Sequence, residues 1–332
     1  MSHNQNKTPG DLVPKHFGSN LTRHDFPDDF LFGAAVSSYQ VEGGYDQGRR
    51  GMSNWDAWSL LRPGRCGIDE KTRDRYLQAF NFMVKNIARH DYAQYAELCF
   101  FEFGDRVKFW ITINELCTYT SAGYISGGFP PGHGSPAGEL GLTDTVRYRS
   151  APGVDQTCFG GNPATDPYKV AHHLILAYAT AVDIYRRKYQ AIQGGKIGTT
   201  NAINWYIPYS ELPEDIAATK RAIAFVLGWF IEPLVSGEYP KVMRKRVEDR
   251  LPKFKPEEEK LAGSEWLYIV PVGIYELLVY AKEKYNDPVI YITENGVDEK
   301  NHKHLPLSIL LDDDYRIKYH QEHLAYVKLA ME

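Results

Sequence analysis

Two kinds of hydrophobic pattern follow one another along most of this chain. Short apolar runs predict strands buried in a sheet at residues 30–38, 107–113, 196–205 and 289–293. Apolar residues at helical spacing predict helices at residues 91–103, 166–190, 214–230 and 274–285, and a final helix that starts near Asp312. Strands that alternate with helices are typical of βαβ units, so we expect an α/β fold with a parallel sheet.

The segments between these elements predict less regular structure. Residues 1–25 are polar, and we expect them to form an N-terminal tail in front of a single domain over residues 26–332. Gly, Pro and Ser are frequent in residues 121–167, and so long a connection in a compact domain is usually a functional loop. Residues 237–262 are charged and interrupted by proline, which favours a position on the surface.

Composition and charge argue against several functional classes. The 38 Lys and Arg residues against 42 Asp and Glu give a net charge of −4, which provides no electrostatic attraction to nucleic acid or an anionic membrane. No apolar run reaches the roughly 18 residues of a membrane span, and residues 1–25 lack the apolar core of a secretory signal. We therefore expect an intracellular protein with neither nucleic acid nor membrane as a partner.

The cysteines and histidines do not predict a metal site. The four cysteines form no CxxC pair, so we expect free thiols in a reducing compartment: Cys66, Cys99, Cys117 and Cys158. Three pairs of histidines lie close in sequence: His172 and His173, His302 and His304, and His320 and His323. No matching carboxylate completes a ligand set around any pair, and histidines at the surface or in the core are far more common than metal ligands.

Two of the predicted strands end next to a glutamate. Asn114 and Glu115 follow the apolar run at residues 107–113, and Glu294 follows the run at residues 289–293. Catalytic groups of parallel α/β folds gather at the C-terminal ends of the strands, so two such carboxyl groups in one barrel would face each other. Glycoside hydrolysis needs such a pair: an acid for the leaving oxygen, and a carboxylate that attacks the sugar or activates water. Salt bridges or helix caps are the structural alternative.

Longer motifs around these glutamates resemble one enzyme family. Residues 30–43 (FLFGAAVSSYQVEG), 110–115 (WITINE) and 289–296 (VIYITENG) resemble the N-terminal, acid/base and nucleophile signatures of family 1 glycoside hydrolases, the β-glucosidase family. The motifs follow one another in the family's order. Other stretches, such as LGWFIEPLVSGEYPK, are similar to plant members, and the nearest resemblance is to alkaloid glucosidases of the strictosidine and raucaffricine glucosidase kind.

The resemblance implies a (β/α)8 TIM barrel that hydrolyses O-glucosides with retention of configuration and without a metal or organic cofactor. Its partner would be a small-molecule β-glucoside of a plant alkaloid or another specialised metabolite. Glu294 then matches the nucleophile, and Glu115 matches the acid/base that protonates the departing oxygen and later deprotonates water. Gln40 matches the glutamine that binds hydroxyls on the far side of glucose, and Asn114 matches the residue at the 2-hydroxyl.

The chain also departs from the family's pattern. Between Glu70 and His90 it lacks an arginine that contacts the nucleophile and a His-Trp motif that binds glucose, both carried by the family's second and third strands. It lacks the Asn-Tyr-Tyr motif of the sixth strand after Glu265, and it stops at Glu332, before the eighth strand. Leu116 replaces the proline of the family's Asn-Glu-Pro. About four of the eight strands are matched, so we expect a shortened, incomplete barrel with weak or no activity on its own.

A catalytically inactive relative is the alternative function. Missing strands leave unpaired backbone groups and an exposed apolar interior, and large exposed apolar patches mark interaction sites or aggregation liabilities. Such a chain would bind full-length paralogues, form a homo-oligomer or bind other proteins. A product with no stable fold is the third hypothesis.

Overall fold

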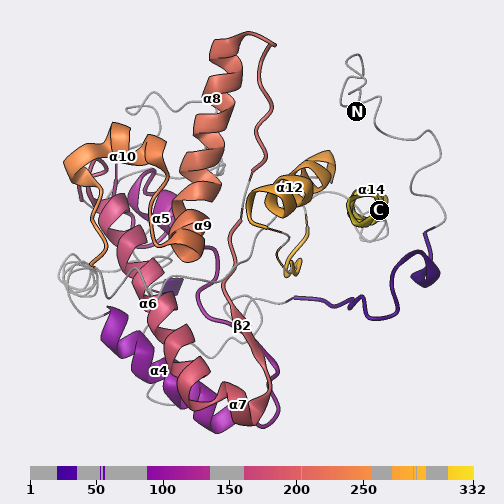
Figure 1. Cartoon of the computed structure of the whole chain (residues 1–332), viewed down its shortest axis with the longest axis horizontal. Helices are drawn as coiled ribbons and strands as arrows, with labels where there is room; N and C mark the ends of the chain where they lie inside the picture. Colours follow the sequence, from indigo (N-terminus) through magenta and orange to yellow (C-terminus); the bar gives the residue numbers. More distant parts are fainter. Residues whose placement is uncertain are drawn as a thin grey trace, which may run out of the picture.

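The structure, a computed structural model, contains helices arranged around one small parallel sheet (Figure 1). It describes residues 21–35, 53, 55–56, 88–134, 161–202, 204–255, 271–286, 288, 290–296 and 313–332. In that part of the chain the sheet has two strands, β1 (Phe109–Ile111) and β2 (Lys196–Gly198), which pair in parallel. The strands predicted at residues 107–113 and 196–205 are confirmed, although both are shorter than predicted.

The helices occupy most of the remaining described residues. Their bounds are α4 (Ala88–Phe103), α5 (Leu116–Tyr124), α6 (Asp166–Lys188), α7 (Gln190–Gln193), α8 (Pro213–Ile223), α9 (Trp229–Ser236), α10 (Lys241–Val247), α12 (Pro271–Lys284) and α14 (Asp314–Met331). A π-helical turn at Ala224–Gly228 joins α8 to α9, and 3-10 turns lie at Arg23–Asp25 and Glu248–Arg250.

These helices confirm the helical pattern of the sequence with one difference. The predicted helices at residues 91–103, 274–285 and near Asp312 correspond to α4, α12 and α14, and that at 166–190 corresponds to α6 with the start of α7. The helix predicted at residues 214–230 instead consists of α8, the π-helical turn and α9. It ends only at Ser236, and the left-handed φ of 77° at Gly237 is typical of the residue after a helix.

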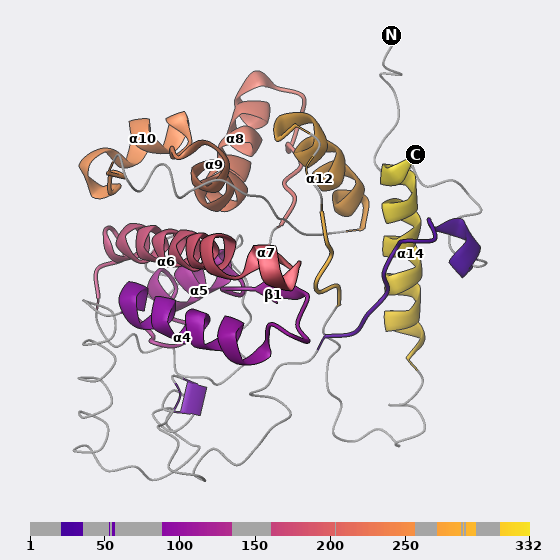
Figure 2. The same ribbon diagram turned by 60° about the horizontal axis from the view of Figure 1, so that its bottom comes forward.

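The core lies between β1 and the helices α4, α5, α6 and α9. Figure 2 shows α4 and α6 side by side, with α8, α9 and α10 in a further tier. Helix α6 packs against α4, α5 and α9 and buries one residue after another, including Ile175, Tyr178 and Tyr185. A parallel strand pair needs a long crossover connection, and α6 lies in the connection between β1 and β2.

The two faces of β1 have different surroundings. Trp110 faces the helices, where its ring contacts Phe100 of α4 at 5.0 Å and Tyr185 of α6 at 6.5 Å between ring centroids. Successive side chains of a strand point to opposite faces, so Phe109 and Ile111 lie on the other side. They are 53% and 48% exposed. The face of β1 that would look into a barrel is therefore only partly covered.

The last helix is attached to the first described segment. Figures 1 and 2 show α14 near α12 and next to the chain around Arg23–Asp25. Ile274 of α12 packs with Tyr326 and Val327 of α14. The Lys328 ammonium lies 2.8 Å from the Asp25 carboxylate, and this hydrogen bond is the main reason that the pKa of Asp25 is lowered to about 2. The two ends of the described chain are thus connected by an ion pair.

Two strand predictions are wrong for the residues that the structure describes. Residues 30–35 and 290–296 belong to no strand, and Leu31 and Phe32 are 67% and 52% exposed instead of buried. A strand needs a neighbour to pair with, and within the described residues neither segment has a ladder partner. The parts of these predictions that concern residues 36–38 and residue 289 lie outside the described residues.

Two loop predictions also need correction. The connection predicted at residues 121–167 begins as helix, since α5 extends to Tyr124, and residues 135–160 lie outside the described part. The segment predicted at the surface, residues 237–262, is described as far as residue 255, and this part is not confined to the surface. Helix α10 buries Met243 and Val247 completely or nearly so, because these apolar residues lie four positions apart on one face of a short basic helix.

The structure also bears on the membrane and thiol predictions. Among the described residues no single helix combines the length and apolar character of a membrane span, while the bent pair Pro213–Ser236 and Lys241–Arg250 does so by length and composition alone. Cys99 and Cys117 are free thiols. Cys66 and Cys158 lie outside the described residues.

Shortening a buried side chain of α6 should destabilise this core. We expect Ile175→Ala to lower the free energy of unfolding by about 2–5 kcal/mol, because Ile175 is fully buried and its truncation leaves a cavity. Urea denaturation followed by circular dichroism measures this change. Ile192→Ala is the matched control: Ile192 is 87% exposed, so its change should stay within about 0.5 kcal/mol. Equal losses for the two variants would contradict the described core.

Candidate active site

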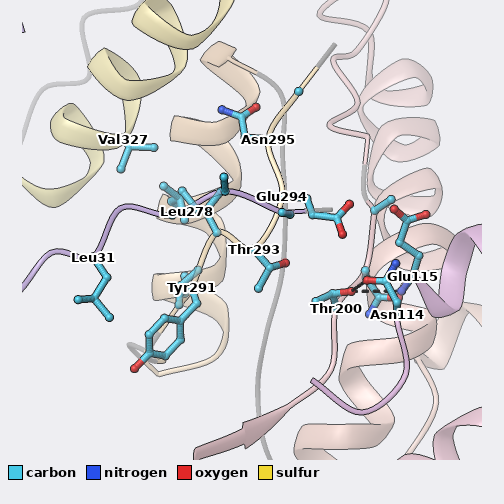
Figure 3. A pocket seen from close by; sticks show the side chains of 18 of the residues that line it. Leu31, Asn114, Glu115, Thr200, Leu278, Tyr291, Thr293, Glu294, Asn295 and Val327 are labelled. Atoms are coloured by element: carbon cyan, nitrogen blue, oxygen red, sulfur yellow. Dashed lines mark hydrogen bonds between the residues drawn. The ribbon is translucent and has the colours of Figure 1, made fainter. Parts of the chain in front are cut away.

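A cleft of about 2070 Å³ opens beside the ends of β1 and β2. The extended segments 30–35 and 290–296 and helix α14 contribute to its other walls (Figure 3). Asn114, Glu115 and Glu294 all line it. Pockets for small molecules typically measure about 300–1,000 Å³, so this cleft exceeds what one glucose needs.

Glu115 stands at the junction between β1 and α5. The strand end is held to β2 by the Thr112 amide, which donates to the Gly198 carbonyl at 2.9 Å. The chain then turns sharply, and Glu115 adopts a left-handed conformation (φ 50°, ψ 58°) as the N-cap residue of α5. Its side chain makes no capping hydrogen bond, so the carboxylate remains directed to the cleft.

Two polar residues after β2 hold this turn. The Thr200 hydroxyl accepts a hydrogen bond from the Glu115 amide at 3.2 Å and donates one to Asn114 Oδ1 at 2.6 Å. The side chain of the next residue, Asn201, accepts a hydrogen bond from the Cys117 amide at 3.1 Å. Asn114 and Glu115 are therefore fixed to the neighbouring strand by side chains as well as by the ladder.

Glu294 reaches the same cleft from the other wall. Figure 3 shows its side chain pointing toward the wall that carries Asn114 and Glu115. Partial burial and, after it, the negative charge of Glu115 raise the pKa of the Glu294 carboxyl above its ordinary value. An effect of one carboxylate on the other requires that the two groups share the same space. The cleft thus holds two interacting carboxyl groups from segments far apart in sequence.

Side-chain contacts attach the segment of Glu294 to the sheet. Tyr291 accepts a hydrogen bond from the Lys196 ammonium at 2.8 Å, and its ring contacts the Phe109 ring at 5.6 Å between centroids. Both partners belong to the two strands, Lys196 to β2 and Phe109 to β1. These contacts hold residues 290–296 opposite Glu115 without a strand ladder.

The thiol closest in sequence to Glu115 is not a nucleophile candidate. Burial and the charge of Glu115 raise the pKa of Cys117 to about 12. A thiol with such a pKa stays protonated near neutral pH, and only the thiolate is reactive. The carboxyl groups of Glu115 and Glu294 remain the candidates for nucleophilic and acid–base chemistry in this cleft.

The structure brings together three of the four predicted site residues. Asn114, Glu115 and Glu294 line one cleft, whereas Gln40 lies outside the described residues. Thr200 and Asn201, which hold the turn at Glu115, were not among the predicted site residues. Consecutive polar residues directly after a buried strand were the signal that could have identified them.

One histidine from each of two predicted pairs has a structural partner. His172 Nδ1 hydrogen-bonds to the Tyr239 hydroxyl at 2.9 Å, and His323 Nδ1 hydrogen-bonds to the Tyr319 carbonyl at 2.7 Å. Across the described ranges no group of three or more His, Cys, Asp or Glu side chains is arranged to hold a metal ion. His302 and His304 lie outside these ranges.

Sequence comparison finds relatives among plant β-glucosidases. An oleuropein β-glucosidase of Olea europaea is 39% identical over 441 residues, covering 94% of this chain and 80% of the relative. A raucaffricine-O-β-D-glucosidase of Rauvolfia serpentina is 32% identical over 450 residues, covering 96% of this chain and 83% of the relative. Both alignments are longer than the 332 residues of this chain, so internal segments of the relatives are missing here.

The family profile locates these missing segments. The profile described as glycosyl hydrolase family 1 matches residues 22–88, 77–263 and 258–332. Successive matches overlap at residues 77–88 and 258–263, where one match passes to the next. They lie within or close to the two internal places where the sequence analysis finds family motifs missing, after Glu70 and near Glu265.

Comparison with solved structures gives the fold. A mutant of rice Os3BGlu6 β-glucosidase in a covalent complex with Glc superposes with a TM-score of 0.80 at 29% identity, covering 94% of this chain and 88% of that one. A β-glucosidase of the fungus Humicola insolens in complex with glucose gives a TM-score of 0.63 at 26% identity, covering 83% and 71%. These β-glucosidases are (β/α)8 barrels. The chain therefore belongs to glycosyl hydrolase family 1, is a glycoside hydrolase by that membership, and has an incomplete form of the family's (β/α)8 barrel.

Proposed function

We propose that this chain hydrolyses O-glucosides of plant specialised metabolites by a retaining mechanism that uses two carboxyl groups. One observation carries the proposal: Glu115 and Glu294 line the same cleft, where partial burial and, after it, the charge of Glu115 raise the pKa of Glu294. Both residues stand in motifs that resemble the family's acid/base and nucleophile signatures. Membership of the family supplies the reaction class, which is hydrolysis of a small-molecule glucoside.

In this mechanism Glu294 attacks the anomeric carbon, and Glu115 gives its proton to the departing oxygen. The products of this first step are the free aglycone and a glucosyl ester of Glu294. Glu115 then takes a proton from water, which attacks the anomeric carbon, releases glucose and restores both carboxyl groups. Retention of configuration follows from the two successive displacements.

The walls of the cleft suit a substrate with a large aglycone. Relatives of this chain are named for oleuropein and raucaffricine. The cleft has room beyond a single glucose, and Leu31, Phe32 and Phe129 add apolar surface to its lining. Asn114 would hold the 2-hydroxyl of the sugar next to Glu115, and Gln40 would bind hydroxyls farther away.

A second candidate function is favoured by the exposed apolar side chains of the cleft. Phe109, Leu31 and Phe32 are each more than half exposed, although the corresponding face of a closed barrel is filled by side chains. A full-length family member could cover this surface, because it carries the segments that are missing here. In that case the chain would act through association with a paralogue instead of through its own turnover.

Hydrolysis of a chromogenic nitrophenyl β-glucoside tests the first proposal. We expect slow release of nitrophenol by the purified chain and loss of this activity to background in Glu294→Gln, because the amide cannot form the ester. Glu115→Gln should lower the rate by roughly 10²–10⁴-fold, the usual contribution of a general acid. A fluorosugar glucoside should label the wild type covalently at Glu294 in a mass spectrum. Unchanged turnover in Glu294→Gln would refute the proposed role.

The charge of Glu115 should be measurable through Glu294. We expect Glu115→Gln to lower the pKa of Glu294, because one of the two causes of its raised value disappears while partial burial remains. Titration of the side-chain carboxyl carbon by NMR measures this shift. Glu115→Asp keeps the charge and is the control in which the pKa of Glu294 should stay raised. The same titration curve in wild type and Glu115→Gln would show that the two carboxyl groups do not interact.

Co-elution tests the association. Size-exclusion chromatography of the chain mixed with a full-length paralogue should give a common peak, which Phe109→Glu should abolish by placing a charge on the apolar surface. Ile192→Glu, on the exposed helix α7, should leave the peak unchanged. Separate elution of the two wild-type proteins would rule out association as the function.

A further inference from the structure

The start of α5 is capped from the neighbouring strand instead of by its own N-cap residue. The first amides of a helix need acceptors from outside the helix. The Glu115 side chain provides none, and the acceptors are the Thr200 hydroxyl for the Glu115 amide and Asn201 Oδ1 for the Cys117 amide. Thr200 and Asn201 follow β2 directly, so the strand pair itself carries the cap.

In this arrangement the Glu115 carboxylate does not cap the helix. A glutamate or aspartate at the start of a helix commonly stabilises the free amides with its own side chain. Here Thr200 and Asn201 accept from two of these amides, those of Glu115 and Cys117, and the left-handed conformation of Glu115 turns its side chain to the cleft. A residue other than glycine adopts this conformation only where its surroundings hold it there.

The same Thr200 hydroxyl also orients Asn114. It donates to Asn114 Oδ1 at 2.6 Å and accepts from the Glu115 amide. The hydroxyl proton of Thr200 therefore serves the first hydrogen bond, and one of its oxygen lone pairs serves the second. With Oδ1 occupied, the amide nitrogen of Asn114 is the group directed to a ligand. A sugar hydroxyl next to it would therefore be bound as a hydrogen-bond acceptor.

We propose that Thr200 is a positioning residue for both Glu115 and Asn114, and that Asn201 is the second half of this Thr200–Asn201 clamp. The inference rests on the proposed glucosidase function and extends it to residues that do not touch the reacting atoms. The clamp keeps the acid/base and the group next to the 2-hydroxyl at a fixed separation, since one hydroxyl binds the backbone of the first and the side chain of the second.

The adjacent threonine provides a matched control. The Thr199 hydroxyl donates to the Ile113 carbonyl at 2.5 Å, so it also joins the ends of the two strands. Thr199 is 2% exposed and Thr200 is 5% exposed. Replacing either threonine by valine removes a buried hydroxyl at almost the same place. Only Thr200→Val removes the hydrogen bonds to the Glu115 amide and to Asn114 Oδ1.

Leaving-group dependence separates positioning from general stability. A dinitrophenyl glucoside needs little protonation of its leaving oxygen, whereas an alkyl glucoside depends on the general acid. We expect Thr200→Val to lower kcat/KM for the alkyl glucoside roughly 10–100-fold, which is the effect of misplacing a catalytic group. The loss of kcat/KM for the dinitrophenyl glucoside should be smaller by a factor of at least about 5. Thr200→Ser keeps the hydroxyl and should have wild-type kcat/KM for both glucosides. Thr199→Val should leave the ratio of the two kcat/KM values unchanged. Equal losses for both substrates, or no loss, would overturn the role of Thr200.

A measurement without turnover distinguishes failure of the clamp from failure of the proposed function. Hydrogen exchange of the backbone amides, followed by NMR, should show Glu115 protected in wild type and Thr200→Ser. In Thr200→Val the Glu115 amide should exchange at least about 10-fold faster, while the neighbouring helix amides of α6 keep their protection. If the wild type hydrolyses no glucoside but shows this pattern, the proposed function fails and the clamp stands. A Glu115 amide unprotected in wild type refutes the clamp whatever the activity.

Discussion

The pairing of β1 with β2 is the constraint on which the site depends. Parallel strands end at the same edge, so the pairing brings Thr200 next to Glu115 although 85 positions separate them. Side chains alternate along an extended chain, and Thr199 and Thr200 therefore have different partners, the Ile113 carbonyl and the Glu115 amide. A shift of the register by one residue would exchange these partners and leave Asn114 without its hydrogen bond.

The two carboxyl groups are held in different ways. Glu115 follows a paired strand and has its backbone fixed by Thr200, whereas the segment of Glu294 is attached through the Tyr291 side chain to Lys196 and Phe109. Loss of a ladder partner removes several backbone hydrogen bonds at once, and two side-chain contacts replace only part of them. The wall with the nucleophile candidate is consequently the less constrained wall of the cleft.

The local hydrophobic pattern of the sequence predicted the helices of this fold better than it predicted which segments pair as strands. Apolar residues at helical spacing predict the helix that is α6. Its fully buried Ile175 and Tyr178 show how closely it packs against α4, α5 and α9, which the spacing alone does not indicate. Residues 290–293 have the composition of a buried strand, yet pairing depends on neighbours that a local pattern does not contain. The two glutamates were predictable because their motifs are local. Thr200 and Asn201 stand out in the sequence only as polar residues after a buried strand, and their partners, the Glu115 and Cys117 amides, follow from the strand register.

The open interior connects the two candidate functions. Electrostatic stabilisation and proton transfer are strongest where water is excluded, and a cleft of about 2070 Å³ with Phe109 half exposed is open to solvent. A partner that covers Phe109, Leu31 and Phe32 would also narrow the space around Glu115 and Glu294, since all five residues line the same cleft. Association and turnover therefore depend on the same surface. A partner that covers the apolar part of this surface would exclude water from the cleft and so favour proton transfer and nucleophilic attack by its carboxyl groups.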